Sequence, residues 1–281
     1  MPFNISMFGD EIAPELETQL RVMSENGVFL LEMRGVDGKP VVDATAAEQA
    51  EMKRKLDSYG VSVWSIGSPI GKIEITDDFA PHFEKFKYTC ETAHRMGTKR
   101  IRAFSFYMPQ EKCDEYRSKV IEQVLQMVEY GLSQDVYFCH ENEGGIYGQA
   151  SERCLDLIEQ SQGKMRYVFD AANYICHGYE PFPYAFDMLE KHIDYIHIKD
   201  ADGVSKEICV AGKGDAKYTQ MLSRVAKWNR PVTLSLEPHL TVFSGRAALE
   251  KDPHLQNTFS TGEEAFKAAL CALKNIIADL N

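Results

Sequence analysis

Short runs of β-branched and aromatic residues recur along the whole chain, and most are followed by longer segments with apolar residues at helical spacing. We expect strands in eight of these runs, namely 3–7, 29–33, 61–66, 100–104, 136–141, 166–170, 195–200 and 232–237. Helical spacing is clear in the segments 83–96, 116–132, 153–160, 218–228 and 263–280. Strands that alternate with helices in this way pair in parallel through βαβ crossovers.

Eight strand–helix units in one chain of this length average about 35 residues each, which is what a closed (β/α)₈ barrel requires. A doubly wound open sheet is the alternative, but it usually carries a G-x-G-x-x-G turn after its first strand. Here that turn reads Phe8-Gly9-Asp10-Glu11. No linker rich in Pro, Gly or Ser divides the chain, so we predict an α/β protein with a single TIM-barrel domain over residues 1–281.

Composition and charge narrow the classes of function. The 281 residues are 44% hydrophobic and 26% charged, which is enough apolar material for one large domain. The net charge of −11 argues against nucleic acid as a partner. We expect no membrane span and no secretory signal, because the chain has no 18-residue apolar run and begins MPFNISMFGDEIAPE. Seven scattered cysteines without a C-x-x-C pair are typical of reduced thiols, so we expect a cytoplasmic protein.

Four consecutive predicted strands contain or end in a residue type that binds metals. These residues are Glu141, Asp170, His197 and Glu237. Neighbouring strand ends of a closed barrel form one ring, where three carboxylates would repel one another unless a cation neutralised them. Such ligands suit Mn²⁺, Mg²⁺, Co²⁺ or Zn²⁺, so we predict one divalent metal ion. The alternative for a single acid at a strand end is a helix N-cap, and it applies most directly to Asp170.

Five motifs resemble those of the xylose-isomerase-like barrel superfamily: HENEGGIYG (140–148), FDAANY (169–174), HIKDA (197–201), GKGDA (212–216) and LSLEPHL (234–240). This superfamily contains sugar isomerases and epimerases, dehydratases and apurinic-site endonucleases. The resemblance is good over the second half of the chain, whereas the first half matches mainly by its strand–helix rhythm. It implies that Glu141, Asp170, His197 and Glu237 hold one divalent ion, and that Glu141 and Glu237 also form an acid/base pair.

The function that this resemblance implies is isomerisation or epimerisation of a sugar or sugar-like polyol ketone through an enediolate. Proton abstraction beside a carbonyl needs a positioned base, and the enediolate oxygens need a cation. A dehydratase acting on an inosose or a dehydroshikimate-type acid is the alternative. A non-catalytic sugar-binding barrel is a third interpretation. Endonuclease members need further histidines after strands 2, 3 and 4, which this chain lacks, and together with the net charge of −11 this argues against DNA repair.

Several more residues are candidates for the site. Glu143 and Lys199 lie two positions beyond Glu141 and His197, on the same strand faces, and we predict catalytic roles for both. Glu143 could instead be a solvated loop acid, and Lys199 could form a salt bridge to Glu237 or Asp170. We assign substrate binding to four other side chains: Glu32, Arg34, His239 and Asn173. An alternative for Glu32 and Arg34 is that they pair with each other. Asn173 stands where several epimerases and the endonucleases of the superfamily carry histidine.

Two segments are longer than a barrel needs, residues 201–216 and 238–260. Both follow strands at the C-terminal face, so we expect lids or oligomer contacts there. Relatives often pair through this face, so a homo-oligomer is an expectation as well. The glycines of GKGDA could converge on an anion, or they could order the rim of the site, which is the interpretation we prefer.

Overall fold

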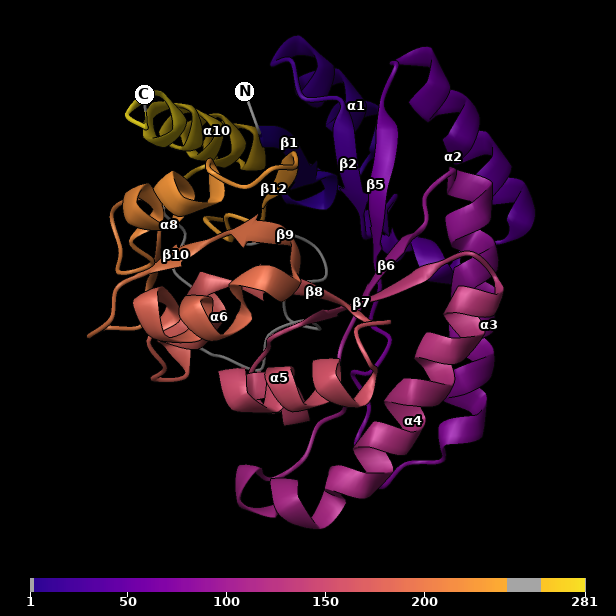
Figure 1. Cartoon of the computed structure of the whole chain (residues 1–281). Helices are drawn as coiled ribbons and strands as arrows, with labels where there is room; N and C mark the ends of the chain where they lie inside the picture. Colours follow the sequence, from indigo (N-terminus) through magenta and orange to yellow (C-terminus); the bar gives the residue numbers. More distant parts are fainter. Residues whose placement is uncertain (1–2, 242–258, 281) are drawn as a thin grey trace.

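The computed structural model describes residues 3–241 and 259–280, and it shows a closed barrel of eight parallel strands (Figure 1). Around the barrel the order is β1-β12-β9-β8-β7-β6-β5-β2. The strands are β1 (Phe3–Phe8), β2 (Leu30–Met33), β5 (Ser62–Gly67), β6 (Arg100–Ala103), β7 (Tyr137–Glu141), β8 (Arg166–Asp170), β9 (Ile193–Ile198) and β12 (Val232–Leu236). The predicted (β/α)₈ barrel is therefore confirmed, and each predicted strand is present within a few residues of its expected bounds.

Helices connect the strands and cover the outside of the barrel (Figure 1). They are α1 (Leu16–Glu25), α2 (Ala46–Ser58), α3 (Phe79–Met96), α4 (Cys113–Ser133), α5 (Ser151–Gln160), α6 (Ala171–Cys176), α7 (Phe186–Leu189), α8 (Tyr218–Val225) and α10 (Gly262–Ala278). Local sequence fixes several helix ends. Thr45 and Glu48 form a capping box at the start of α2, and Gly97 ends α3 with a φ of 77°. No helix among the described residues is both long enough and apolar enough to cross a membrane.

Strand register decides which polar residues meet inside the barrel. Along β9, Tyr195 and His197 share one face, and Ile196 and Ile198 share the other. His197 is in register with Asp170 on one neighbouring strand and with Ser235 on the other. Because side chains alternate along each strand, Glu237 lies one layer above Ser235, towards the C-terminal face. This arrangement directs the predicted ligands into one space.

The segment after β9 differs from the expected strand of residues 195–200. The strand ends at Ile198, and a short hairpin follows, β10 (Asp200–Ala201) with β11 (Ile208–Cys209). A similar hairpin, β3 (Gly35–Val36) with β4 (Lys39–Pro40), follows β2. The second long segment, 238–260, lies mostly outside the described residues.

One buried carboxylate fastens the long segment after β9. Asp200 accepts hydrogen bonds from the backbone N–H groups of Ala201, Gly212, Gly214 and Ala216, at 2.9, 2.8, 3.1 and 3.0 Å. A Cβ atom at Gly214 would lie 2.3 Å from the Ala201 carbonyl oxygen, so only glycine fits this approach. Because three amides of the GKGDA turn already bind the Asp200 carboxylate, this turn orders the rim of the barrel and those amides are not available to an anionic ligand.

Candidate metal centre

The C-terminal ends of neighbouring strands bring the four predicted ligands together. One donor atom from each of Glu141, Asp170, His197 and Glu237 lies within 4.8 Å of the others, and all four residues are buried. The Nδ1 atom of His197 is at the centre of the group. It lies 3.0 Å from Glu141 Oε1, 3.2 Å from Glu237 Oε2 and 3.9 Å from Asp170 Oδ2.

The chemistry of this donor set fits a divalent cation. Asp170 Oδ2 and Glu237 Oε2 are buried atoms without a hydrogen-bond partner. Leaving a charged oxygen in that state is costly unless a cation compensates it. Burial, together with nearby Glu141 and Glu237, raises the pKa of Asp170 to about 6, although Lys199 opposes the shift. One imidazole nitrogen and three carboxylates are suitable ligands for Mn²⁺, Mg²⁺, Co²⁺ or Zn²⁺.

Asp170 performs two tasks with its two oxygens. Oδ1 accepts a hydrogen bond of 2.8 Å from the backbone N–H of Asn173 and caps α6, while Oδ2 faces His197 and Lys199. The helix-cap interpretation and the ligand interpretation are therefore compatible. Asn173 adds a side-chain contact, because its Nδ2 donates to the Asn142 carbonyl at 2.9 Å and to Glu141 Oε1 at 3.3 Å. Asn173 thus lies directly beside a candidate ligand.

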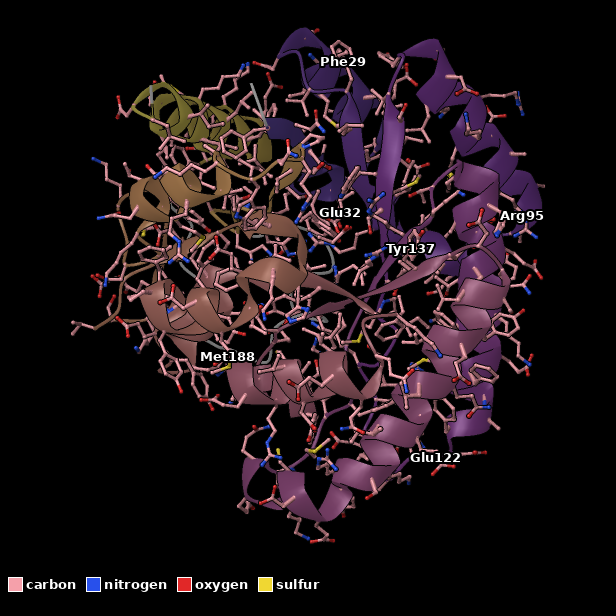
Figure 2. The ribbon with its side chains drawn as sticks, viewed as in Figure 1. Phe29, Glu32, Arg95, Glu122, Tyr137 and Met188 are labelled. Atoms are coloured by element: carbon pink, nitrogen blue, oxygen red, sulfur yellow. The ribbon has the colours of Figure 1, made fainter. Side chains whose placement is uncertain are left out.

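Glu32 orients the histidine from the opposite side of its ring. His197 Nε2 lies 3.1 Å from Glu32 Oε2, and the carboxylate also accepts hydrogen bonds of 2.6 Å from Tyr195 and from Ser235. A carboxylate can only accept, so Nε2 keeps its proton and Nδ1 is left to face the ligand group. In Figure 2 Glu32 lies inside the barrel. The imidazole ring separates Glu32 from the other three candidate ligands, so Glu32 contacts the group through His197.

The carboxylates around His197 determine its pKa. Burial alone would lower the pKa of His197, but Glu141, Glu32 and Glu237 raise it well above its usual value. Burial alone would also raise the pKa of Glu32, whereas His197 and Arg102 lower it overall. A cation that binds at Nδ1 must therefore replace a tightly held proton.

Each of the two predicted acid/base glutamates has one carboxylate oxygen next to a guanidinium group. Arg102 Nε lies 3.3 Å from Glu141 Oε2, and Arg34 Nη1 donates to Glu237 Oε1 at 2.8 Å. Both arginines lie against the Phe8 ring, with Cζ atoms 4.3 Å (Arg34) and 5.4 Å (Arg102) from its centroid. Each glutamate therefore presents its other oxygen to His197.

Gly67 makes room for this arrangement between β2 and β6. A Cβ atom there would lie 2.7 Å from the Phe8 ring and 3.0 Å from Arg34 Cβ. Arg34 continues outward to Asp10, with Nε and Nη2 donating to the Asp10 carboxylate at 2.8 and 3.1 Å. Arg34 and Glu32 thus have different partners and do not form the mutual pair that the sequence offers as an alternative.

The remaining predicted residues lie around the same space. Lys199 Nζ is 3.1 Å from Asp170 Oδ2 and 3.7 Å from Glu237 Oε2, so both salt bridges considered for it are present. Glu143 pairs with Lys72 at 3.0 Å. Burial alone would raise the pKa of Glu143, but Lys72 and Lys199 lower it overall. At neutral pH Glu143 is therefore ionised and has no proton to donate.

His239 lies on the far side of Glu237. Its backbone N–H donates to Glu11 Oε2 at 2.8 Å, and its Nε2 is 3.4 Å from both Glu11 Oε1 and Glu237 Oε1. Glu11, Glu237 and His239 form a second group with metal-ligand geometry. The guanidinium of Arg34 already contacts both carboxylates of this group, at 3.3 Å from Glu11 and 2.8 Å from Glu237. Arg34 therefore supplies the positive charge there.

Sequence reasoning missed Arg102 and Lys72, which lie next to the predicted residues. Arg102 lies within β6 and is 2% exposed. The four ligands are identified by metal-binding residue types at strand ends, and arginine does not meet that criterion. The signal that could have found Arg102 is the cost of a charged residue inside a barrel strand, which applies to the RIRAF run. Lys72 lies in the connection between β5 and α3, where no periodic pattern places a side chain.

Comparisons with known proteins agree with this architecture. A family model described as xylose isomerase-like TIM barrel matches residues 20–255. Among solved structures, the probable 3-DHS dehydratase AsbF from Bacillus anthracis has a TM-score of 0.75 at 14% identity, covering 97% of this chain and 99% of that chain. D-psicose 3-epimerase from Clostridium cellulolyticum H10 has a TM-score of 0.74 at 12% identity, covering 99% of both chains. At such identities these two likenesses show the fold alone. No curated protein matches the sequence.

Proposed function

The chain belongs to the xylose isomerase-like TIM barrel family, and on that premise we propose that it is a divalent-metal-dependent isomerase or epimerase of a sugar or sugar-like polyol ketone. Glu141, Asp170, His197 and Glu237 would hold the ion. When bound, the ion supplies positive charge that stabilises the oxygens of an enediolate.

The observation that carries this proposal is the matched placement of Glu141 and Glu237. One oxygen of each glutamate pairs with an arginine, Arg102 for Glu141 and Arg34 for Glu237. The other oxygen lies within 3.2 Å of His197 Nδ1. They come from β7 and from the end of β12, strands that β8 and β9 separate in the barrel. Two such carboxylates can approach one bound substrate from two sides, which is what transfer of a proton between the faces of a carbon requires.

Proton transfer would proceed between these two side chains. Burial alone would raise the pKa of Glu237, but Lys199, His239 and His197 lower it well below its usual value. Glu237 is therefore ionised at neutral pH, which is the form that a general base must have. Return of a proton by Glu141 to the opposite face of the same carbon gives epimerisation. Return to the neighbouring carbon gives aldose–ketose isomerisation. We assign to Lys199 a hydrogen bond to a substrate oxygen, and to Arg34, Asn173 and His239 contacts with substrate hydroxyls.

A dehydratase is the second candidate, and Lys199 is the observation that favours it. Its ammonium group lies 3.1 Å from Asp170 Oδ2 and could protonate a departing hydroxyl group. Glu143 is less suited to that step, because the ion pair with Lys72 keeps it ionised. Loss of water from a β-hydroxy ketone leaves a conjugated enone, so this reaction is visible by ultraviolet absorbance.

The test is solvent exchange in D₂O with a panel of ketoses and keto-polyols and with Mn²⁺ or Co²⁺ added. We expect deuterium at one substrate carbon with the wild-type protein, and no exchange with Glu141→Gln or Glu237→Gln. Metal content is measured for each variant, because both residues are also ligands. Glu122→Gln, on the exposed surface of α4 (Figure 2), is the matched control. Exchange that survives in Glu237→Gln would contradict the acid/base assignment, and sugar binding without exchange would favour a non-catalytic barrel.

A further inference from the structure

The ammonium group of Lys199 contacts the same oxygens that the proposed metal would use. It lies 3.1 Å from Asp170 Oδ2 and 3.7 Å from Glu237 Oε2. Among the described residues, these are the two buried carboxylate oxygens that have no hydrogen-bond partner. Lys199 is 4% exposed, so little water reaches this ion pair.

The backbone of Lys199 cannot move away with its side chain. Its N–H donates to the Tyr218 hydroxyl at 3.0 Å, and its carbonyl oxygen accepts from the same hydroxyl at 2.8 Å. Tyr218 is itself buried at the start of α8. Any displacement of the ammonium group must therefore come from rotation about the side-chain bonds.

A divalent ion and this ammonium group would repel each other strongly. A metal bound to carboxylate oxygens lies about 2.0–2.2 Å from them, and the Lys199 nitrogen is within 3.7 Å of two of those oxygens. Like charges at such separations, shielded from water, raise each other's free energy considerably. Occupation of the site by one cation therefore opposes the other.

We propose that Lys199 is a built-in competitor for the metal ion. Without metal it is the counter-ion of Asp170 and Glu237 and stabilises the barrel. Metal binding takes over that role and turns the ammonium group away from Asp170, towards the substrate. The inference rests on the metal site of the proposed function and adds that Lys199 sets the affinity of that site.

The test compares Lys199→Met with the wild-type protein and with a matched control. Lys72→Met is the control, because Lys72 is another largely buried lysine but pairs with Glu143, which is not a ligand. Lys199→Gln is measured as well, in case the methionine variant folds poorly. The readouts are the Mn²⁺ dissociation constant by calorimetry and the melting temperature in chelator and in saturating Mn²⁺.

We expect Lys199→Met to bind Mn²⁺ more tightly, by an amount of the order of the 10- to 100-fold changes typical of substitutions next to metal ligands. Its melting temperature in chelator should fall, and saturating Mn²⁺ should restore it. Lys72→Met should keep the wild-type dissociation constant. An unchanged or weaker constant in both Lys199 variants would overturn the inference while leaving the metal site intact. Absence of binding in the wild-type protein would contradict the metal site itself, and the inference with it.

Discussion

Replacing Glu32 by glutamine removes one negative charge behind the metal-facing histidine while leaving the hydrogen bonds largely in place. The amide oxygen can accept from His197 Nε2 and from Ser235, as Glu32 Oε2 does at 3.1 and 2.6 Å. The amide NH₂ group then faces the Tyr195 hydroxyl, which can donate to Ser65 Oγ at 3.3 Å instead. The substitution therefore isolates the effect of the charge from that of the ring orientation.

The size of the effect follows from where the charge lies. Two unit charges 4 Å apart interact by about 4 kcal/mol at an effective dielectric constant of 20. Glu32 lies farther than this from the ligand group, because the imidazole ring is between them. We therefore expect a loss in metal-binding free energy of about 1.4–2.7 kcal/mol, which corresponds to a 10- to 100-fold larger dissociation constant. The same substitution also weakens proton binding at Nδ1, but the doubly charged metal loses about twice as much Coulomb energy as the proton.

The assay is calorimetric titration with Mn²⁺ at pH 7.5, after removal of bound metal with a chelator. Ser235→Ala is the control, because it deletes a neighbouring hydrogen bond to Glu32 but leaves both the charge and the His197 contact. We expect the control to bind Mn²⁺ like the wild-type protein. A Glu32→Gln protein with the wild-type dissociation constant would refute the view that Glu32 acts on the metal through His197.

Three further substitutions test buried charged or titratable side chains of the barrel. Arg102→Met leaves Glu141 without its guanidinium partner, and we expect urea denaturation to show a loss of about 3–5 kcal/mol; unchanged stability would contradict the pairing. Asp200→Ala leaves four backbone N–H groups without their acceptor, so the free energy of unfolding should fall by at least about 2 kcal/mol and amide exchange at Gly212 should accelerate. Burial lowers the pKa of His82 to about 4, below its ordinary 6.5, so the folded protein binds fewer protons than the unfolded chain between these values. The contribution of His82 to the free energy of unfolding is complete above pH 6.5 and is lost as the pH falls towards 4, by up to roughly 3 kcal/mol. In His82→Gln, the free energy of unfolding measured by urea denaturation should therefore fall less steeply between pH 7.5 and 4.5.

The barrel and the positions of the candidate ligands could be predicted from the sequence because both depend on short-range patterns. Strand periodicity places a residue on the inner or outer face, and consecutive strands of a barrel are neighbours, so Asp170 and His197 were expected to meet. Their observed register confirms that expectation.

Side-chain partners across the barrel could not be predicted in the same way. Glu32 and His197 are 165 positions apart in the chain, and their contact depends on barrel closure and on side-chain rotamers, neither of which leaves a local pattern. The early end of β9 has a similar origin. Asp200 turns away from the strand because its carboxylate binds amides up to 16 residues further along the chain.

The two halves of the chain supply different parts of the candidate metal site. All four candidate ligands come from the second half, from β7 to the end of β12. Glu32, Arg34 and Arg102, which orient or neutralise those ligands, come from the first half. A substitution in the first half can therefore alter how the ligands are oriented and charged while every ligand is retained. In evolutionary terms, such a barrel can alter the surroundings of its candidate site through one half of its sequence while the four candidate ligands in the other half stay the same.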